Sequence, residues 1–176
     1  MARQDPFANP AEAVRRVYAY AAYRLGDGAE AEDVTSATIE RALRYRTSYD
    51  SGKGDPAAWL VGIARRTIDE HYRRQALAET VATVPERASD PFEERSIERL
   101  AMAAAVGRLD PRERELVALR YGADLTARQI AELLGQRTNT VEGALHRALA
   151  RLRAMVEAVD SEPAVRKPGL GSVEGI

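Results

Sequence analysis

The spacing of apolar positions predicts a chain built from amphipathic helices. Apolar residues recur every three or four positions along residues 14–25, 34–43, 59–71 and 141–156, which is the repeat of a single helix face. Ala, Leu, Arg and Glu dominate the composition, and all four favour helix. We therefore expect an all-α fold.

Local start and stop signals agree with this periodicity. A capping side chain followed by proline occurs at Asn9-Pro10, Asp55-Pro56 and Asp110-Pro111, which is typical of a helix N-terminus. Gly26 and Gly135 follow the last periodic residues of two segments and predict helix ends. These signals predict helices over residues 10–25, 30–46, 56–75, 93–107, 111–121, 126–134 and 139–157.

The first three helices are expected to form a compact bundle. Its inward positions are predicted to be Val14, Val17, Tyr18, Ala21, Ala22, Leu25, Val34, Thr38, Ile39, Ala42, Leu43, Trp59, Leu60, Ile63, Ala64, Thr67, Ile68 and His71. The place of Trp59 on the apolar stripe favours a core role. For Tyr72 a core role and an exposed stacking role both stay open.

The pattern divides the 176 residues into two small helical domains joined by a flexible linker. We expect a first domain over residues 9–75, an acidic linker over 76–92, and a second domain over 93–157. Residues 158–176 contain Pro and Gly with an acidic balance and are predicted to be disordered.

Composition excludes several classes of site. The chain has no cysteine and two histidines, so we expect no disulfide, thiolate zinc site, iron–sulfur cluster or other metal. It carries no Gly-rich phosphate loop or nucleophile elbow, which predicts a protein that is not an enzyme and has no catalytic residues, cofactor or small-molecule substrate. Without an apolar signal core or a membrane-length apolar run, it is expected to be cytoplasmic, with no membrane insertion.

The net charge of −1 hides an alternating pattern. Residues 1–75 carry net +1, residues 76–107 net −3, residues 108–153 net +3 and residues 154–176 net −2. A basic second domain favours an anionic partner such as nucleic acid.

Residues 126–152 carry the strongest local signal. A short helix closing at Gly135, a tight turn and a longer amphipathic helix predict a helix-turn-helix, with the small Ala131 where the helices approach. The second helix would fit a major groove about 12 Å wide. A plain helical hairpin is the alternative interpretation.

Two stretches resemble bacterial sigma factors, and the resemblance covers about residues 10–153. Residues 109–121 are similar to the opening of the promoter-recognition domain, region four, and residues 125–153 continue it. Residues 31–43 resemble the polymerase-docking helix of region two, and residues 59–74 its promoter-melting helix. A chain with these two regions alone resembles the extracytoplasmic-function group.

The resemblance implies a sigma factor that binds the clamp and flap of core RNA polymerase, directs it to specific promoters and helps open promoter DNA. It implies polymerase contacts from Asp33, Val34, Ala37, Thr38, Glu40 and Arg41. It implies minus-ten DNA contacts from Lys53, Arg65, Arg66, Asp69, Tyr72, Arg73 and Arg74. The minus-thirty-five element would meet Arg112, Arg114, Arg128, Arg137, Thr138, Asn139, Thr140, Glu142, Gly143, His146 and Arg147. An anti-sigma protein is a further expected partner, and the acidic linker would mimic nucleic acid in the RNA-exit channel.

Glu142, Gly143 and Ala144 stand where family members often carry Lys, Ser and Arg. We expect Asn139 and Glu142 to form a capping box; alternatively, Glu142 accepts a hydrogen bond from a cytosine amino group. Because Glu142 and Ala144 replace two cations that are common in the family, two other functions stay open. One is a sigma-like interaction protein that binds polymerase or a regulatory partner but reads DNA poorly, and the other is a stand-alone helix-turn-helix regulator.

Overall fold

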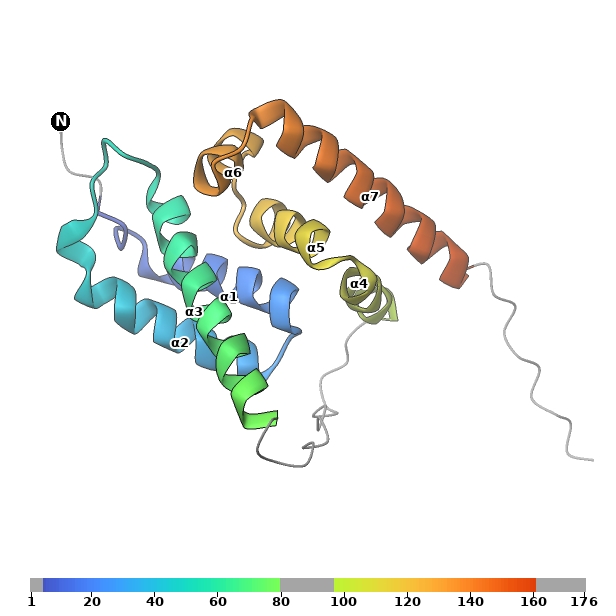
Figure 1. Cartoon of the computed structure of the whole chain (residues 1–176), viewed down its shortest axis with the longest axis horizontal. Coiled ribbons are helices and arrows are strands. Elements are labelled where there is room, and N and C mark those ends of the chain that lie inside the picture. The colour runs from blue at the N-terminus through green and yellow to red at the C-terminus, as the bar shows by residue number, and fades with distance from the viewer. Residues whose placement is uncertain (1–4, 80–96, 161–176) are drawn as a thin grey trace, which may run out of the picture.

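The computed structural model describes residues 5–79 and 97–160, which form seven α-helices, a 3₁₀ turn and a π-helical turn (Figure 1). Within these two ranges there is no β-strand, so the all-α prediction is confirmed. None of the helices in the described ranges is both long and apolar enough to cross a membrane.

The N-terminal unit contains α1 (Pro10–Leu25), α2 (Ala29–Arg44), the 3₁₀ turn η1 (Arg46–Ser48) and α3 (Pro56–Glu79). Most of the predicted stripe is buried, including Val17, Val34 and Ile68. The inward placement of Val14 and Leu43 is wrong, because these side chains are 43% and 52% exposed. The apolar face that these three helices bury is therefore narrower than the spacing of apolar residues predicted.

The predicted helix starts rest on side-chain caps. The Asn9 carboxamide accepts a hydrogen bond from the Glu12 amide at 3.2 Å, and the Asp55 carboxylate accepts from the Ala57 amide at 2.8 Å. Asp110 accepts from the amides of residues 112 and 113, both at 2.9 Å. Each cap satisfies amides that have no partner inside the helix.

The C-terminal unit contains α4 (Ile97–Arg108), α5 (Pro111–Val117), the π-helical turn η2 (Ala118–Gly122), α6 (Ala127–Leu134) and α7 (Thr138–Asp160). The turn η2 extends α5 with a wider winding in which the Ala123 amide donates to the Ala118 carbonyl at 2.9 Å. Nothing in the apolar spacing predicted this turn. Turns of this kind are rare and are often found at functional positions.

The two units pack directly against each other. One hydrophobic cluster runs through both, joining Val17 and Tyr20 of α1 to Leu119 of η2 and Ile130 of α6. A second cluster lies within the C-terminal unit between α4, α5 and α7. Two separately folded domains on a tether were expected, so this shared core is a finding that the sequence analysis did not anticipate.

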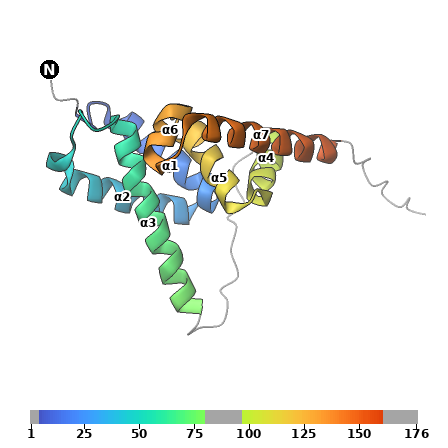
Figure 2. The same ribbon diagram turned by 45° about the horizontal axis from the view of Figure 1, so that its top comes forward.

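The helix ends differ slightly from the predicted boundaries. Helix α3 continues to Glu79, four residues into the predicted linker, and α7 continues to Asp160, three residues into the predicted tail. The remaining linker residues 80–92 and tail residues 161–176 lie outside the described residues. In Figure 2 the C-terminal half of α3 projects beyond the other helices.

Candidate nucleic-acid interface

Helices α6 and α7 form the predicted helix-turn-helix. The Thr126 hydroxyl accepts from the Gln129 amide at 3.2 Å, while the Gln129 side chain accepts from the Thr126 amide at 2.8 Å. At the other end of α6, Gly135 adopts a left-handed conformation with φ of 63°. These local features fix the angle at which the chain enters α7.

The side chains behind this turn are buried, which orients α7. Ile130 and Val141 are fully buried, and Leu145 is nearly so. The opposite side of α7 is therefore turned to solvent. The exposed members of the predicted minus-thirty-five set on this side are Arg137, Asn139, Thr140, Glu142, His146 and Arg147, with Thr138 and Gly143 half-buried.

The capping box predicted from Asn139 and Glu142 is wrong. Helix α7 begins at Thr138, and the amides of Thr140 and Val141 donate to the Arg137 carbonyl at 3.0 and 3.2 Å. Asn139 thus lies inside the first turn rather than before it. Glu142 remains an exposed carboxylate on the outward face.

The three arginines predicted to flank this face differ in their contacts. Arg112 is exposed, and Arg128 is exposed with an ion pair to Glu132 at 2.9 Å. The guanidinium of Arg114 instead donates to the carbonyls of Gly107 and Leu109, the latter at 3.1 Å. Arg114 therefore ties the end of α4 to α5 and has a structural role that the sequence did not indicate.

Helix α3 carries a second basic face. Arg66, Arg73 and Arg74 are exposed along its length, together with Asp69. The last two arginines donate through Nε to carbonyls one turn back, at 3.2 and 3.4 Å. Arg66, Arg73 and Arg74 are therefore the predicted minus-ten cations of α3 that point away from the core.

The loop before α3 is held by aromatic packing. The ring centroids of Tyr49 and Trp59 lie 5.5 Å apart. The buried Tyr49 donates a hydrogen bond from its hydroxyl to the Gly54 carbonyl at 2.9 Å. Trp59 packs against the hydrophobic cluster, so its predicted core role is confirmed. Lys53 stays exposed, 3.6 Å from Asp50.

Tyr72 lies at the edge of the N-terminal unit. Its side chain is 39% exposed, and its hydroxyl donates to the Arg24 carbonyl at the end of α1 at 3.1 Å. The ring keeps an accessible side while the hydroxyl is anchored. This geometry is compatible with the predicted stacking role and with a bridge from α3 to α1.

The predicted polymerase-docking helix α2 divides into two faces. Asp33, Ala37 and Glu40 are exposed. Val34 and Thr38 are buried, at 3% and 0% exposure, so their prediction as direct contacts is wrong. They sit one turn apart on the inner face, where they support the exposed residues.

Arg41 joins α2 to α3 rather than pairing within its own helix. Its guanidinium donates to both carboxylate oxygens of Glu70, at 2.8 and 3.1 Å. This bidentate pairing lowers the pKa of the Glu70 carboxyl and raises the pKa of Arg41. Both side chains remain partly exposed, Arg41 at 36% and Glu70 at 40%.

A charged cluster between the two units was missed by sequence reasoning. The Glu115 carboxylate of α5 forms ion pairs with Arg24 of α1 and Arg65 of α3, the latter at 2.8 Å, and accepts from the Tyr20 hydroxyl at 3.0 Å. Burial raises the pKa of that hydroxyl. Glu115 and Arg24 are each only 12% exposed. The cluster borders a cleft of ≈ 400 Å³ that is also lined by Asp69, Pro111, Arg112, Leu116, Leu134 and Gln136.

Comparison with known proteins identifies both units. Residues 11–77 match the family model for Sigma-70 region 2, and residues 99–152 match the model for Sigma-70, region 4. The chain is 32% identical over 147 residues to the ECF RNA polymerase sigma factor BldN of Streptomyces coelicolor, covering 80% of this chain and 56% of that relative. It is 31% identical over 136 residues to the RNA polymerase sigma-E factor of the same organism, covering 76% of each.

A solved structure shares the fold. The sigma factor RpoE of Bartonella quintana, in complex with the anti-sigma factor NepR, matches with a TM-score of 0.68 at 21% sequence identity, over 82% of this chain and 92% of that one. Two regions matched in order, and a sigma-E relative matched over three quarters of both lengths, carry the assignment. The chain belongs to the extracytoplasmic-function group of the sigma-70 family of RNA polymerase sigma factors.

Proposed function

We propose that this sigma factor binds core RNA polymerase, directs it to specific promoters and helps to open the DNA for initiation. The observation that carries the proposal is the presence, in one chain, of two exposed basic faces on separate matched regions, one on α3 and one on α7. Among the described residues no group of three or more His, Cys, Asp or Glu side chains is placed to hold a metal ion. The role we propose is recognition of polymerase and DNA.

Helix α7 is proposed to enter the major groove of the minus-thirty-five element. Arg137 lies directly before this helix, which is about 35 Å long, Arg147 lies within it, and both side chains are exposed. Arginine can meet phosphate oxygens or a guanine edge in a bidentate manner. Glu142 is proposed to accept from a cytosine amino group, since it does not cap the helix.

Helix α3 and the loop before it are proposed to hold the minus-ten strand after opening. Arg66, Arg73 and Arg74 would contact the sugar–phosphate backbone, with Tyr72 offering a ring face to an unstacked base. Unstacking a base costs a few kcal/mol, which stacking and backbone contacts must offset. The buried Tyr49 and the half-buried Trp59 pack together and support the loop that would contact the base.

The exposed face of α2 is proposed to dock on the polymerase clamp through Asp33, Ala37 and Glu40. The C-terminal unit is proposed to contact the flap through a surface other than the outward side of α7. The site of action is proposed to be the cytoplasm, because that is where bacterial polymerase works. An anti-sigma factor is a further proposed partner, since the Bartonella quintana sigma factor that shares this fold is solved with one.

Run-off transcription with purified core polymerase tests this function. Start sites that appear when the chain is overproduced supply the templates, and binding to core alone and to duplex alone is measured in parallel. Transcripts that require both the chain and core support the proposal. Duplex binding without core binding indicates a stand-alone regulator, and core binding without transcripts indicates a sigma-like interaction protein.

A further inference from the structure

The first residues that the structure describes are joined to the loop that precedes α3. The Asp5 carboxylate accepts two hydrogen bonds from the Arg46 guanidinium, one of them from Nε at 2.9 Å and the other from Nη2. Arg46 is the first residue of η1 and lies 41 positions further along the chain. Two parallel bonds between a guanidinium and a carboxylate fix the orientation of both groups, which a single contact does not.

Asp5 is held in place from its own side of this pair. Its Oδ1 also accepts from the Phe7 amide at 3.0 Å, and its carbonyl accepts from the Ala8 amide at 3.0 Å. Pro6 is buried, and Phe7 packs against the large hydrophobic cluster. The carboxylate therefore projects from a turn that is itself attached to the core.

The turn η1 has no buried side chain of its own. All three of its residues are exposed. Both the amide and the hydroxyl of Ser48 donate to the Tyr45 carbonyl, at 2.9 and 2.7 Å. Such local bonds give the turn its shape but do not determine where it lies relative to the helices. The pair with Asp5 links the turn to a part of the chain that is anchored in the core.

The backbone of Arg46 carries this restraint into the loop. The Arg46 carbonyl accepts from the Tyr49 amide at 3.3 Å. Tyr49 is buried against Trp59, and its hydroxyl bonds the Gly54 carbonyl near the end of the loop. A continuous series of contacts therefore runs from Asp5 through Arg46 and Tyr49 to the last residues before α3.

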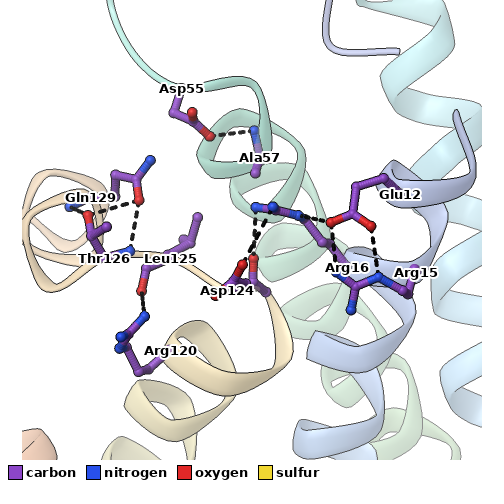
Figure 3. A network of polar contacts seen from close by, with 11 residues as sticks. Glu12, Arg15, Arg16, Asp55, Ala57, Arg120, Asp124, Leu125, Thr126 and Gln129 are labelled. Atoms are coloured by element: carbon purple, nitrogen blue, oxygen red, sulfur yellow. Dashed lines mark hydrogen bonds and ion pairs between the residues drawn. The ribbon is translucent and has the colours of Figure 1, made fainter. Parts of the chain in front are cut away.

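The rest of the loop over residues 49–55 is shaped by its own residues. The Asp50 carboxylate accepts from the Gly52 amide at 2.9 Å, and the Asp50 carbonyl accepts from the Lys53 amide at 3.0 Å. Figure 3 shows the Asp55 carboxylate directed to the Ala57 amide, where it caps the start of α3. The end of the loop at α3 is thus fixed locally, whereas the end at η1 is restrained by a distant residue.

We propose that Asp5 is a positioning residue for the loop over residues 49–55. By holding Arg46 it fixes η1 and, through Tyr49, keeps the loop in one conformation. The consequence for DNA rests on the function proposed above, in which this loop contacts an unstacked base of the minus-ten element. A loop that is ordered in advance loses less conformational entropy on binding and adapts less readily to a wrong base. Asp5 therefore increases base discrimination without touching the base.

Fluorescence of the free chain tests the control of the loop by Asp5. Trp59 is the single tryptophan of the chain, so its quenching by acrylamide reports on the loop residue Tyr49 that packs against it. Asp5→Asn keeps an oxygen for the Phe7 amide but removes the charge and the two-bond pairing. We expect a clear rise in the quenching constant, because a loosened loop exposes the indole more often. An unchanged constant would overturn the proposal.

Glu12→Gln is the matched control. Figure 3 shows the Glu12 carboxylate directed to Arg15 and Arg16 of its own helix. The Glu12 side chain is 34% exposed and that of Asp5 is 33% exposed, so both variants lose one charge from a pair of similar exposure. Glu12→Gln should keep the parental quenching constant, and circular dichroism checks that each variant is folded. Arg46→Gln, which breaks the pair from its other side, must raise the constant as Asp5→Asn does.

Base discrimination by the complex with core polymerase tests the consequence for DNA. Promoter opening is compared between a responsive promoter and versions of it in which each minus-ten base is substituted in turn. Asp5→Asn should reduce the ratio of opening on the two kinds of template by about two- to fivefold, the range for a partly exposed ion pair. Core affinity and binding to the minus-thirty-five duplex should not change. An unchanged ratio would contradict a role in discrimination.

A double-mutant cycle determines whether Asp5 acts through Arg46. In the Arg46→Gln chain, Asp5→Asn should have no further effect on quenching or on discrimination. Additive effects would overturn the proposal. Tighter DNA binding by Asp5→Asn with a steeper salt dependence would also overturn it, because Arg46 would then contact phosphate and Asp5 would oppose that contact. If no chain binds core or yields transcripts while quenching still follows the cycle, the sigma function has failed and the control of the loop by Asp5 has not.

Discussion

The two candidate DNA faces differ in how their arginines are engaged. Arg137, directly before α7, and Arg147 within it are exposed, and the turn that precedes α7 is fixed by the caps of α6. On α3, Arg66 is exposed but its neighbour Arg65 is paired with Glu115 of the other unit. The proposed duplex-binding face thus presents exposed arginines, whereas on the proposed single-strand face one arginine is paired with the other unit.

The difference suggests an order of events. Duplex recognition needs only the local geometry of α6 and α7, so it should be measurable in the free chain. Strand holding needs Arg65, so it should be measurable only when the units have separated. Substitutions that change one face and leave the other intact therefore test whether the two faces differ in this way.

The largest effect is expected from a substitution that removes a buried side chain supporting α7. Ile130→Ala empties a fully buried position of α6, and such a change destabilises by about 2–5 kcal/mol. The thermal midpoint should fall and duplex binding should be lost with it. Leu77→Ala, at a position that is 70% exposed, should leave both unchanged; a stable Ile130→Ala chain would show that this core does not support the face.

The next largest effect is expected from a double substitution on α3. Arg65→Ala with Arg66→Ala should reduce promoter opening about tenfold, since each lost phosphate contact weakens binding, while core affinity changes little. Permanganate reactivity of unpaired thymines measures the opening. Arg15→Ala with Arg108→Ala, which also removes two exposed arginines, is the charge-matched comparison. An equal loss of core affinity would place these arginines on polymerase instead.

A smaller effect is expected on α7. Arg147→Ala should weaken duplex binding a few-fold and reduce the slope of log affinity against log salt by about one. The slope is obtained from titrations at several salt concentrations. Arg108→Ala, exposed on α4, should keep the parental slope. If Arg147→Ala also keeps it, Arg147 does not contact phosphate.

The smallest effect concerns the bridge from α2 to α3. Because Arg41 lowers the pKa of Glu70 below its ordinary 4.5, the ionised pair stabilises the fold above that pH, and the contribution is lost as the pH falls through the lowered pKa. Glu70→Gln should therefore destabilise by less than about 1 kcal/mol near neutral pH. Denaturant unfolding should show this difference vanish in acid. A difference that persists in acid would mean the pair is not its source.

The sequence was sufficient to predict features that depend on residues close together in the chain. The caps at Asp110 and Thr126 depend on residues within three positions of each other, and both are present as predicted. It failed at Asn139, where α7 starts one residue earlier on the Arg137 carbonyl. Either start fits the same apolar spacing, so the pattern could not choose between them.

The missed parts depend on contacts between distant segments. Tyr20 is absent from the predicted stripe but fully buried, because the C-terminal unit covers that side of α1. Glu115 received no role from the sequence, and only the fold brings two arginines to it. Gly122 follows the predicted helix over residues 111–121, a position that does not reveal its close approach to α1.

The most direct test of the account follows energy transfer between labels at Ala11→Cys on α1 and Ala150→Cys on α7, both exposed positions, as core polymerase is added to the chain. We predict high transfer efficiency in the free chain, where α3 packs against α6, and a stoichiometric fall to low efficiency as the complex forms. Polymerase binding with the efficiency unchanged would contradict the account, because α3 would then remain packed against α6 of the helix-turn-helix at the promoter.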